Sequence, residues 1–114
     1  MNAKINSQAA DRALKRLGAQ LKIARIKRRI SVKGFAEHIG ASQSTVARLE
    51  RGDAGVSIGT LAMACLVLGE IDRISEFFDP ATDDTGLSLE QAALPKRIRS
   101  KRKTSELSST EKQE

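Results

Sequence analysis

The residues best suited to chemistry in this chain are polar side chains on one short segment, residues 43–51. Val46 and Leu49 lie three residues apart, a spacing that predicts a helix with these two side chains turned toward a core. The amide, hydroxyl and guanidinium groups of the segment then point the other way, and such groups bind base edges and phosphates in the major groove of DNA. The pattern therefore indicates a DNA-binding surface. Its outward-facing residues are Gln43, Ser44, Ala47, Arg48 and Arg51.

No residues in the sequence form a pattern typical of an active site or a metal site. His38 is the only histidine, and no cysteine cluster or pair of carboxylates stands near it. Cys65 is the only cysteine and lies in an apolar run, where we expect a small core side chain whose thiol pKa is raised by burial. The sequence therefore predicts a protein with no enzyme activity, no metal and no cofactor.

The distribution of charge favours a polyanionic partner. The formal net charge is +6, and two basic blocks without acidic residues lie at residues 22–33 and 96–103. Blocks of this kind bind phosphates, although a solvated basic surface without a partner is the alternative for either block taken alone. The nearby polar segment at residues 43–51 favours DNA as the partner of the first block. The cations of that block are Lys22, Arg25, Lys27, Arg28, Arg29 and Lys33.

Apolar periodicity and capping residues predict five helices that position the DNA-binding surface. They are expected at about residues 11–28, 32–39, 43–50, 57–68 and 71–79, and the first four are expected to be capped by Asp11, Ser31, Ser42 and Ser57. Ala36 falls where the second and third helices cross closely, and Gly40 lies in the turn between them, where a positive φ is wanted. Because only three residues are aromatic, the core must be mainly aliphatic, which favours packed helices over a sheet. The predicted fold class is all-α.

The helices form one predicted domain, residues 11–79, between two polar ends. Residues 1–10 are expected to be a disordered arm, and residues 80–114 a mostly disordered basic tail in which a short helical turn could form at about residues 89–94. The longest apolar run, residues 61–68, is too short to span a membrane, and the N-terminus lacks the apolar stretch of a secretory signal. We therefore expect a cytoplasmic, nucleoid-associated protein with no membrane partner.

A longer pattern around the DNA-binding surface resembles a known family. The sequence Leu-Gly-Ala-Gln-Leu-Lys-Ile-Ala-Arg at residues 17–25 and the sequence Ser-x-x-x-Val-x-x-Leu-Glu-x-Gly at residues 42–52 resemble the lambda-repressor-like family, also called Xre-type regulators. The resemblance covers roughly residues 14–78, and the second sequence is quite specific. It implies a helix-turn-helix domain that binds double-stranded DNA.

The resemblance also implies roles for individual residues. Gln43, Ser44 and Arg48 match the positions that face bases. The family often has a polar residue at the start of the second helix, whereas this chain has Val32, so a phosphate contact from that position is in doubt. The residues implied to lie near phosphates are Lys33, Ser42, Thr45 and Arg51.

Arg25 and Glu50 match a pair that often joins the first and third helices in this family. The resemblance implies an ion pair that fixes the recognition helix, and the alternative is that both residues are ordinary surface charges. Removal of one partner of a buried pair can cost about 3–5 kcal/mol. We therefore assign these two residues a structural role.

The last two predicted helices carry more apolar surface than one small core can cover, which predicts a homodimer. Residues 61–68 are apolar on all sides. A two-fold dimer would place two recognition helices about 34 Å apart, which is one turn of DNA. The alternative is that the C-terminal segment folds back over this surface. The predicted interface residues are Met63, Leu66, Val67, Ile71, Ile74, Phe77 and Phe78.

Two further segments, residues 51–61 and 90–103, are similar to the HipB-like antitoxins. These proteins bind a HipA-type serine/threonine kinase toxin and repress the operon that encodes both. The resemblance therefore implies an antitoxin that is also a repressor of its own operator DNA. A stand-alone phage-type repressor is an alternative, and a protein- or RNA-binding adaptor is another. The outward polar groups of residues 43–48 argue against the adaptor.

Overall fold

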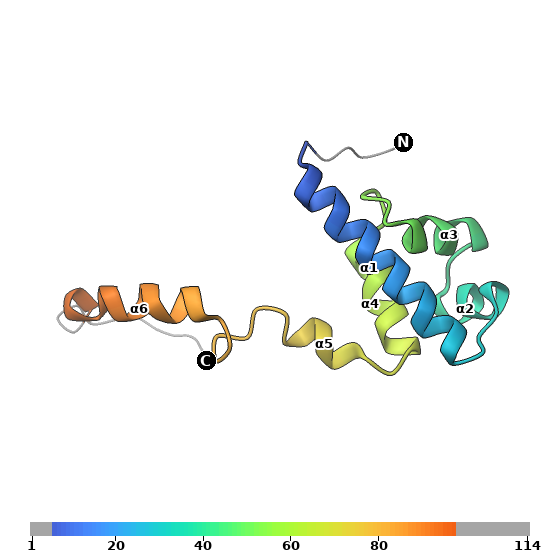
Figure 1. Ribbon diagram of the computed structural model, residues 1–114. Helices are drawn as coiled ribbons and strands as arrows, with labels where there is room; N and C mark the ends of the chain where they lie inside the picture. Colours follow the sequence, from blue (N-terminus) through green and yellow to red (C-terminus); the bar gives the residue numbers. More distant parts are fainter. Residues whose placement is uncertain (1–5, 98–114) are drawn as a thin grey trace. The chain divides into compact units, whose positions relative to one another are not determined.

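The computed structural model describes residues 6–97, and this part of the chain is all-helical, with six helices and no strand (Figure 1). The predicted all-α fold class is therefore confirmed. The chain divides into two units, residues 1–77 and 78–114. The helices are α1 (Gln8–Lys27), α2 (Val32–Ile39), α3 (Gln43–Arg51), α4 (Ile58–Val67), α5 (Ile71–Ser75) and α6 (Asp84–Arg97).

Serine caps begin the first four helices. In each case the serine hydroxyl accepts a hydrogen bond from the backbone N–H three residues later, at 2.9–3.2 Å. The cap of α1 is Ser7, so this helix begins at Gln8 and not near the predicted cap at Asp11. Asp11 instead lies in the first turn and pairs with Lys15 at 2.9 Å. The predicted disordered arm is thus corrected at residues 8–10, and residues 1–5 lie outside the described residues.

One hydrophobic core holds α1–α4 together. α3 packs against α1 and α2, and α4 packs against α2 and α5. Phe35 of α2 and Val46 of α3 are fully buried at its centre. Burial of a side chain of this size stabilises a fold by about 1.5–3 kcal/mol, so these contacts fix α2 and α3 on the scaffold. The core residues are Leu21, Phe35, Ala36, Ile39, Val46, Leu49, Ala64 and Leu68.

Two glycines determine how α2, α3 and α1 meet. Gly40 has φ 81° and connects α2 to α3 through a left-handed residue, the conformation expected for this turn. Gly18 of α1 lies against the backbone at the end of α3, where an added Cβ would be only 2.7 Å from the carbonyl oxygen of Leu49. Since backbone atoms cannot move aside as a flexible side chain can, α1 approaches α3 this closely only with glycine at position 18.

The fifth helix is shorter than predicted. α5 ends at Ser75, and the chain leaves it through a turn in which the N–H of Phe77 donates to the carbonyl of Ile74 at 3.2 Å. As a result, Phe77 and Phe78 lie beyond α5 and not within it.

The second unit contains α6, which corrects the prediction for the C-terminal segment. This 14-residue helix is longer than the turn expected at residues 89–94. Its first turn is supported by Asp83, whose Oδ1 accepts a hydrogen bond from the N–H of Gly86 at 3.0 Å. Residues 98–114 lie outside the described residues. In the described part of the chain, no helix combines the length and the apolarity needed to cross a membrane.

Candidate DNA-binding surface

The helix α3 turns one face to the core and the other to solvent. Val46 and Leu49 are buried, and α2 packs beside them through Phe35, Ala36 and Ile39. Gln43 and Ser44 are exposed in the first turn. The arrangement of two helices joined by the turn at Gly40 is that of a helix-turn-helix, and it leaves the start of α3 open to a partner.

Ser42 organises the start of α3 through its hydroxyl group. Its Oγ accepts from the N–H of Thr45 at 3.1 Å and lies 3.0 Å from the hydroxyls of both Ser44 and Thr45. Three hydroxyl groups therefore cluster where the positive end of the helix dipole also favours an anion. This geometry suits a phosphate near Ser42 and Thr45, two of the four residues that the resemblance implied to lie near phosphates.

Arg48 is held by Asp53, a residue of the turn that follows α3. Its Nε donates to Oδ2 of Asp53 at 3.0 Å, and its side chain remains 33% exposed. The hydrogen bond from Arg48, together with one from the N–H of Gly55, lowers the pKa of the Asp53 carboxyl. Asp53 is thus a charged carboxylate at neutral pH. A cation five residues before an acid was the only signal in the sequence.

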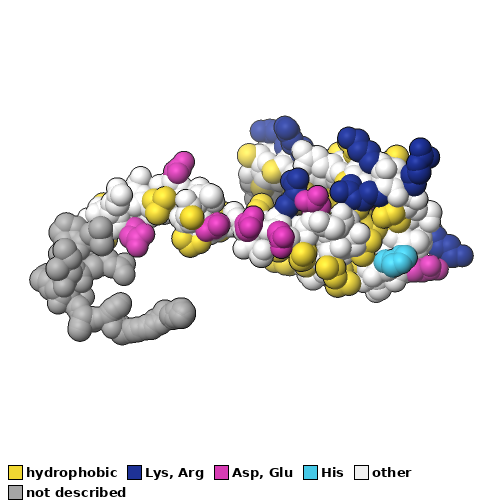
Figure 2. Space-filling model, turned by 90° about the horizontal axis from the view of Figure 1, so that it is seen from below, with side chains coloured by type: hydrophobic (Ala, Val, Ile, Leu, Met, Phe, Trp, Pro, Cys, Tyr) yellow, Lys and Arg dark blue, Asp and Glu magenta, His cyan; other side chains and the backbone are white. Residues whose placement is uncertain are grey.

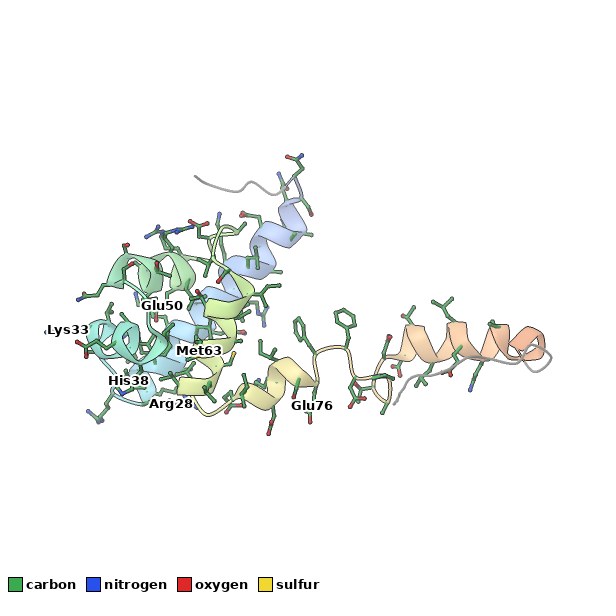
Figure 3. All side chains as sticks on the ribbon, turned by 180° about the vertical axis from the view of Figure 1, so that it is seen from behind. Arg28, Lys33, His38, Glu50, Met63 and Glu76 are labelled. Carbon is green, nitrogen blue, oxygen red and sulfur yellow. The ribbon has the colours of Figure 1, made fainter. Side chains whose placement is uncertain are left out.

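The residues at the start of α2 have different roles. Lys33 is exposed, and Figure 3 shows it at the outer end of α2. Val32 packs against the hydrophobic core, so it supports the helix and is not available to a phosphate. This burial explains why an apolar residue can replace the polar one that the family often has. Arg51, at the end of α3, is exposed like Lys33.

A buried ion pair joins α1 to α3. Arg25 donates from Nε to Oε2 of Glu50 at 2.7 Å and from Nη2 to Oε1 at 3.2 Å, a bidentate arrangement. The side chains of Arg25 and Glu50 are only 8% and 7% exposed. Nη1 of Arg25 also donates to the carbonyl of Ile30 at 2.8 Å, which links the pair to the segment before α2. The pair therefore ties together α1, the segment before α2, and α3.

Two cations of the first basic block have structural partners. Arg25 is buried as described, and Arg28 donates from Nε to the carbonyl of Leu68 at 3.0 Å and from Nη1 to the carbonyl of Ala24 at 2.9 Å. Arg28 thereby caps the end of α4 (Figure 3). This corrects the prediction that the whole block contacts a polyanion. The remaining cations of the block are exposed, namely Lys22, Lys27, Arg29 and Lys33.

Positive charge gathers on one part of the surface of the first unit. In the view of Figure 2, Lys and Arg side chains gather along one edge of this unit. A concentrated positive surface attracts the phosphate backbone of DNA before any base is read. The side chains of the second basic block, residues 96–103, lie outside the described residues.

The residues predicted for a dimer interface differ in their exposure. Met63 and Leu66 of α4 are exposed and three residues apart, and Ile71 of α5 is exposed as well. Val67 packs against the core and Ile74 is partly buried. Phe77 is exposed in the first unit, whereas Phe78, also exposed, belongs to the second. The apolar surplus is therefore smaller than the sequence suggested, because Leu61, Ala64 and Val67 of α4 pack in or against the monomer core.

The described residues contain no group of three or more His, Cys, Asp or Glu side chains that could hold a metal ion. Cys65 is buried, and this burial raises the pKa of its thiol.

Comparison with known proteins identifies the family. A family model described as a helix-turn-helix domain matches residues 16–73, which covers α2, α3 and α4 and most of α1. No curated protein matches the chain. The matched region contains the buried ion pair, the capped start of α3 and the turn at Gly40. The chain therefore belongs to the helix-turn-helix family and is an Xre-like DNA-binding regulator.

Proposed function

We propose that the protein is a sequence-specific repressor whose α3 enters the major groove of its operator DNA. The observation that carries the proposal is the exposed face of α3, fixed from behind by the buried pair of Arg25 and Glu50. In this proposal Gln43, Ser44 and Arg48 contact bases. The phosphate contacts come from Lys33, Ser42, Thr45 and Arg51.

A repressor of this kind blocks transcription by occupying DNA at its promoter. The test is a reporter gene placed behind the DNA upstream of the protein's own gene. We expect expression of the full chain to lower reporter output, and expect a Gln43→Ala variant to lose most of that effect because a base contact is removed. A reporter that responds equally to both proteins would contradict base reading by Gln43.

The proposed repressor binds as a homodimer through α4 and α5. Leu66 is 51% exposed beside Met63 and Ile71, and a second copy would cover this apolar surface. A charge at Leu66 should therefore weaken association. Ile58 supplies a matched control, because it is 79% exposed on the same helix but outside the predicted interface.

The dimer is tested by light scattering at micromolar concentration. We expect twice the monomer mass for the natural protein and for Ile58→Glu, and a lower mass for Leu66→Glu. A natural protein that stays monomeric would overturn the dimer, and equal loss in both variants would move the interface away from Leu66.

We further propose that the protein is a HipB-like antitoxin that binds a HipA-type serine/threonine kinase toxin. The similarity of residues 51–61 and 90–103 to that subfamily supports this role. Coexpression of the full chain with the product of the adjacent gene, followed by purification of the complex, tests it. If the reporter is repressed and no complex forms, the protein acts instead as a stand-alone phage-type repressor.

A further inference from the structure

Asp53 and Arg48 are linked by both backbone and side chains at the end of α3. Gly52, with φ 79°, ends the helix and turns the chain so that the next residue lies beside the last turn. The N–H of Asp53 then donates to the carbonyl of Arg48 at 3.0 Å, while Nε of Arg48 donates to Oδ2 of Asp53, also at 3.0 Å. The N–H of Gly55 donates to the other carboxylate oxygen of Asp53, Oδ1, at 2.7 Å. Both carboxylate oxygens are thus held in place.

This arrangement leaves the outer end of the arginine available. A guanidinium has five N–H groups, and Asp53 accepts a hydrogen bond only from the one on Nε. Within the described residues, no acceptor is bonded to Nη1 or Nη2 of Arg48, and the side chain is 33% exposed. Two parallel N–H groups at the end of an arginine match O6 and N7 of guanine in the major groove.

Holding the side chain in advance has a consequence for recognition. A free arginine loses much rotamer freedom when it is ordered on a base, whereas one already held by a carboxylate loses less. A guanidinium group held in one orientation also discriminates better between bases, because it cannot turn toward the acceptors of a base other than guanine.

We propose that Asp53 is a positioning residue that orients Arg48 to read guanine at one position of the target DNA. The inference rests on the proposed function, in which Arg48 faces bases. Asp53 itself touches no DNA in this scheme, and its carboxylate would repel phosphates if Arg48 did not neutralise it.

The experiment measures base preference for the full-length protein by selection from a random duplex library. Four proteins are compared: the natural chain, Arg48→Ala, Asp53→Asn and the double variant Arg48→Ala/Asp53→Asn. Glu76→Gln is the control, because it removes one exposed negative charge at the end of α5, away from α3 (Figure 3). Thermal melts followed by circular dichroism accompany each selection.

For the natural chain we expect one position with a strong preference for guanine, which Arg48→Ala abolishes. Asp53→Asn should weaken that preference by about five- to twentyfold and leave the other positions unchanged, since a bidentate contact to guanine discriminates by about that order or more. In the Arg48→Ala background, Asp53→Asn should have no effect on base preference. Glu76→Gln should leave the preference at every position as it is.

Two results would overturn the positioning role while the proposed function stands. One is an Asp53→Asn protein that binds all sequences more strongly or more weakly by a single factor, which would be a charge effect or a structural one. The other is an unchanged guanine preference in Asp53→Asn when Arg48→Ala has lost it. If the natural chain selects no sequence, or Arg48→Ala keeps the full preference, the base-reading role of Arg48 fails and the positioning role fails with it.

Discussion

Gly18 of α1 lies directly against Gly52, the residue that ends α3, so closely that a Cβ on Gly18 would be 2.7 Å from the nitrogen of Gly52. A Cβ on Gly52 would in turn lie 2.5 Å from the carbonyl oxygen of Leu14. The two backbones therefore touch without side chains between them. This contact and the ion pair of Arg25 with Glu50 lie on the same two elements, so α1 sets the position of α3.

Gly18→Ala is expected to destabilise the domain by about 1–3 kcal/mol, because the new methyl group would overlap backbone atoms that cannot be displaced locally. Chemical denaturation measures the change. Gly59→Ala is the control, since a Cβ there would meet only Ser57 Oγ, at an ordinary contact distance of 3.7 Å. Gly59 lies in the first turn of α4, where that substitution should be neutral or stabilising by less than about 1 kcal/mol. Equal stability of the two variants would show that α1 and α3 do not meet closely at Gly18.

Replacement of Glu50 by Gln should destabilise the domain by about 3–5 kcal/mol, because Arg25 would remain buried without an opposite charge. The double variant Arg25→Leu/Glu50→Leu should lose less stability than the single variants Arg25→Leu and Glu50→Leu lose together, since no unpaired charge is left. Denaturation of all variants gives the coupling free energy between the two residues. If the change in unfolding free energy of the double variant equalled the sum of the two single changes, the ion pair would not stabilise the domain.

Cys65 should react slowly with iodoacetamide in the folded protein. Its thiol is buried and the pKa of the thiol is raised, so little thiolate is available at about pH 8. We expect labelling, followed by mass spectrometry, to be at least about tenfold faster in guanidinium chloride. Fast labelling of the native protein would contradict the burial of this residue.

The raised pKa of the Cys65 thiol also predicts how the stability of the protein changes with pH. The pKa of the Cys65 thiol is higher in the folded protein than in the unfolded chain. The contribution of the protonated thiol to the free energy of unfolding is therefore fully present below the ordinary thiol pKa of about 8.5, and it is lost as the pH rises through the folded pKa. The difference in unfolding free energy between the natural protein and Cys65→Ala should therefore shrink above about pH 8.5. A difference that stays constant at high pH would argue against the shift.

The sequence predicts the parts of the fold that depend on local signals. Ser31, Ser42 and Ser57 were recognisable as helix caps, and Val46 with Leu49 marked the buried side of α3. Local signals were ambiguous at the first helix, where both Ser7 and Asp11 are good caps. α6 has no broad apolar stripe, so periodicity alone could not reveal its full length.

Other features depend on the tertiary arrangement and could not be read from spacing. The need for glycine at position 18 arises only once α1 crosses α3. The structural role of Arg28 depends on the end of α4 lying beside the end of α1, and the sequence shows only one more cation in a basic block. The contact between Arg48 and Asp53 depends on the dihedral angles of the turn at Gly52.

The central claim, that α3 reads DNA sequence, is tested most directly by fluorescence anisotropy with two duplexes at one fixed salt concentration. One duplex carries the sequence selected from a random library, and the other is a scrambled version of it. Arg48→Ala should weaken the binding free energy for the selected duplex by about 1–3 kcal/mol and change that for the scrambled duplex little, because it removes a base contact. Lys33→Ala should weaken binding to both duplexes alike and reduce the salt dependence, because Lys33 is assigned to a phosphate. If the natural protein bound both duplexes with equal affinity, or if Arg48→Ala weakened both by one factor, recognition of DNA sequence by α3 would be contradicted.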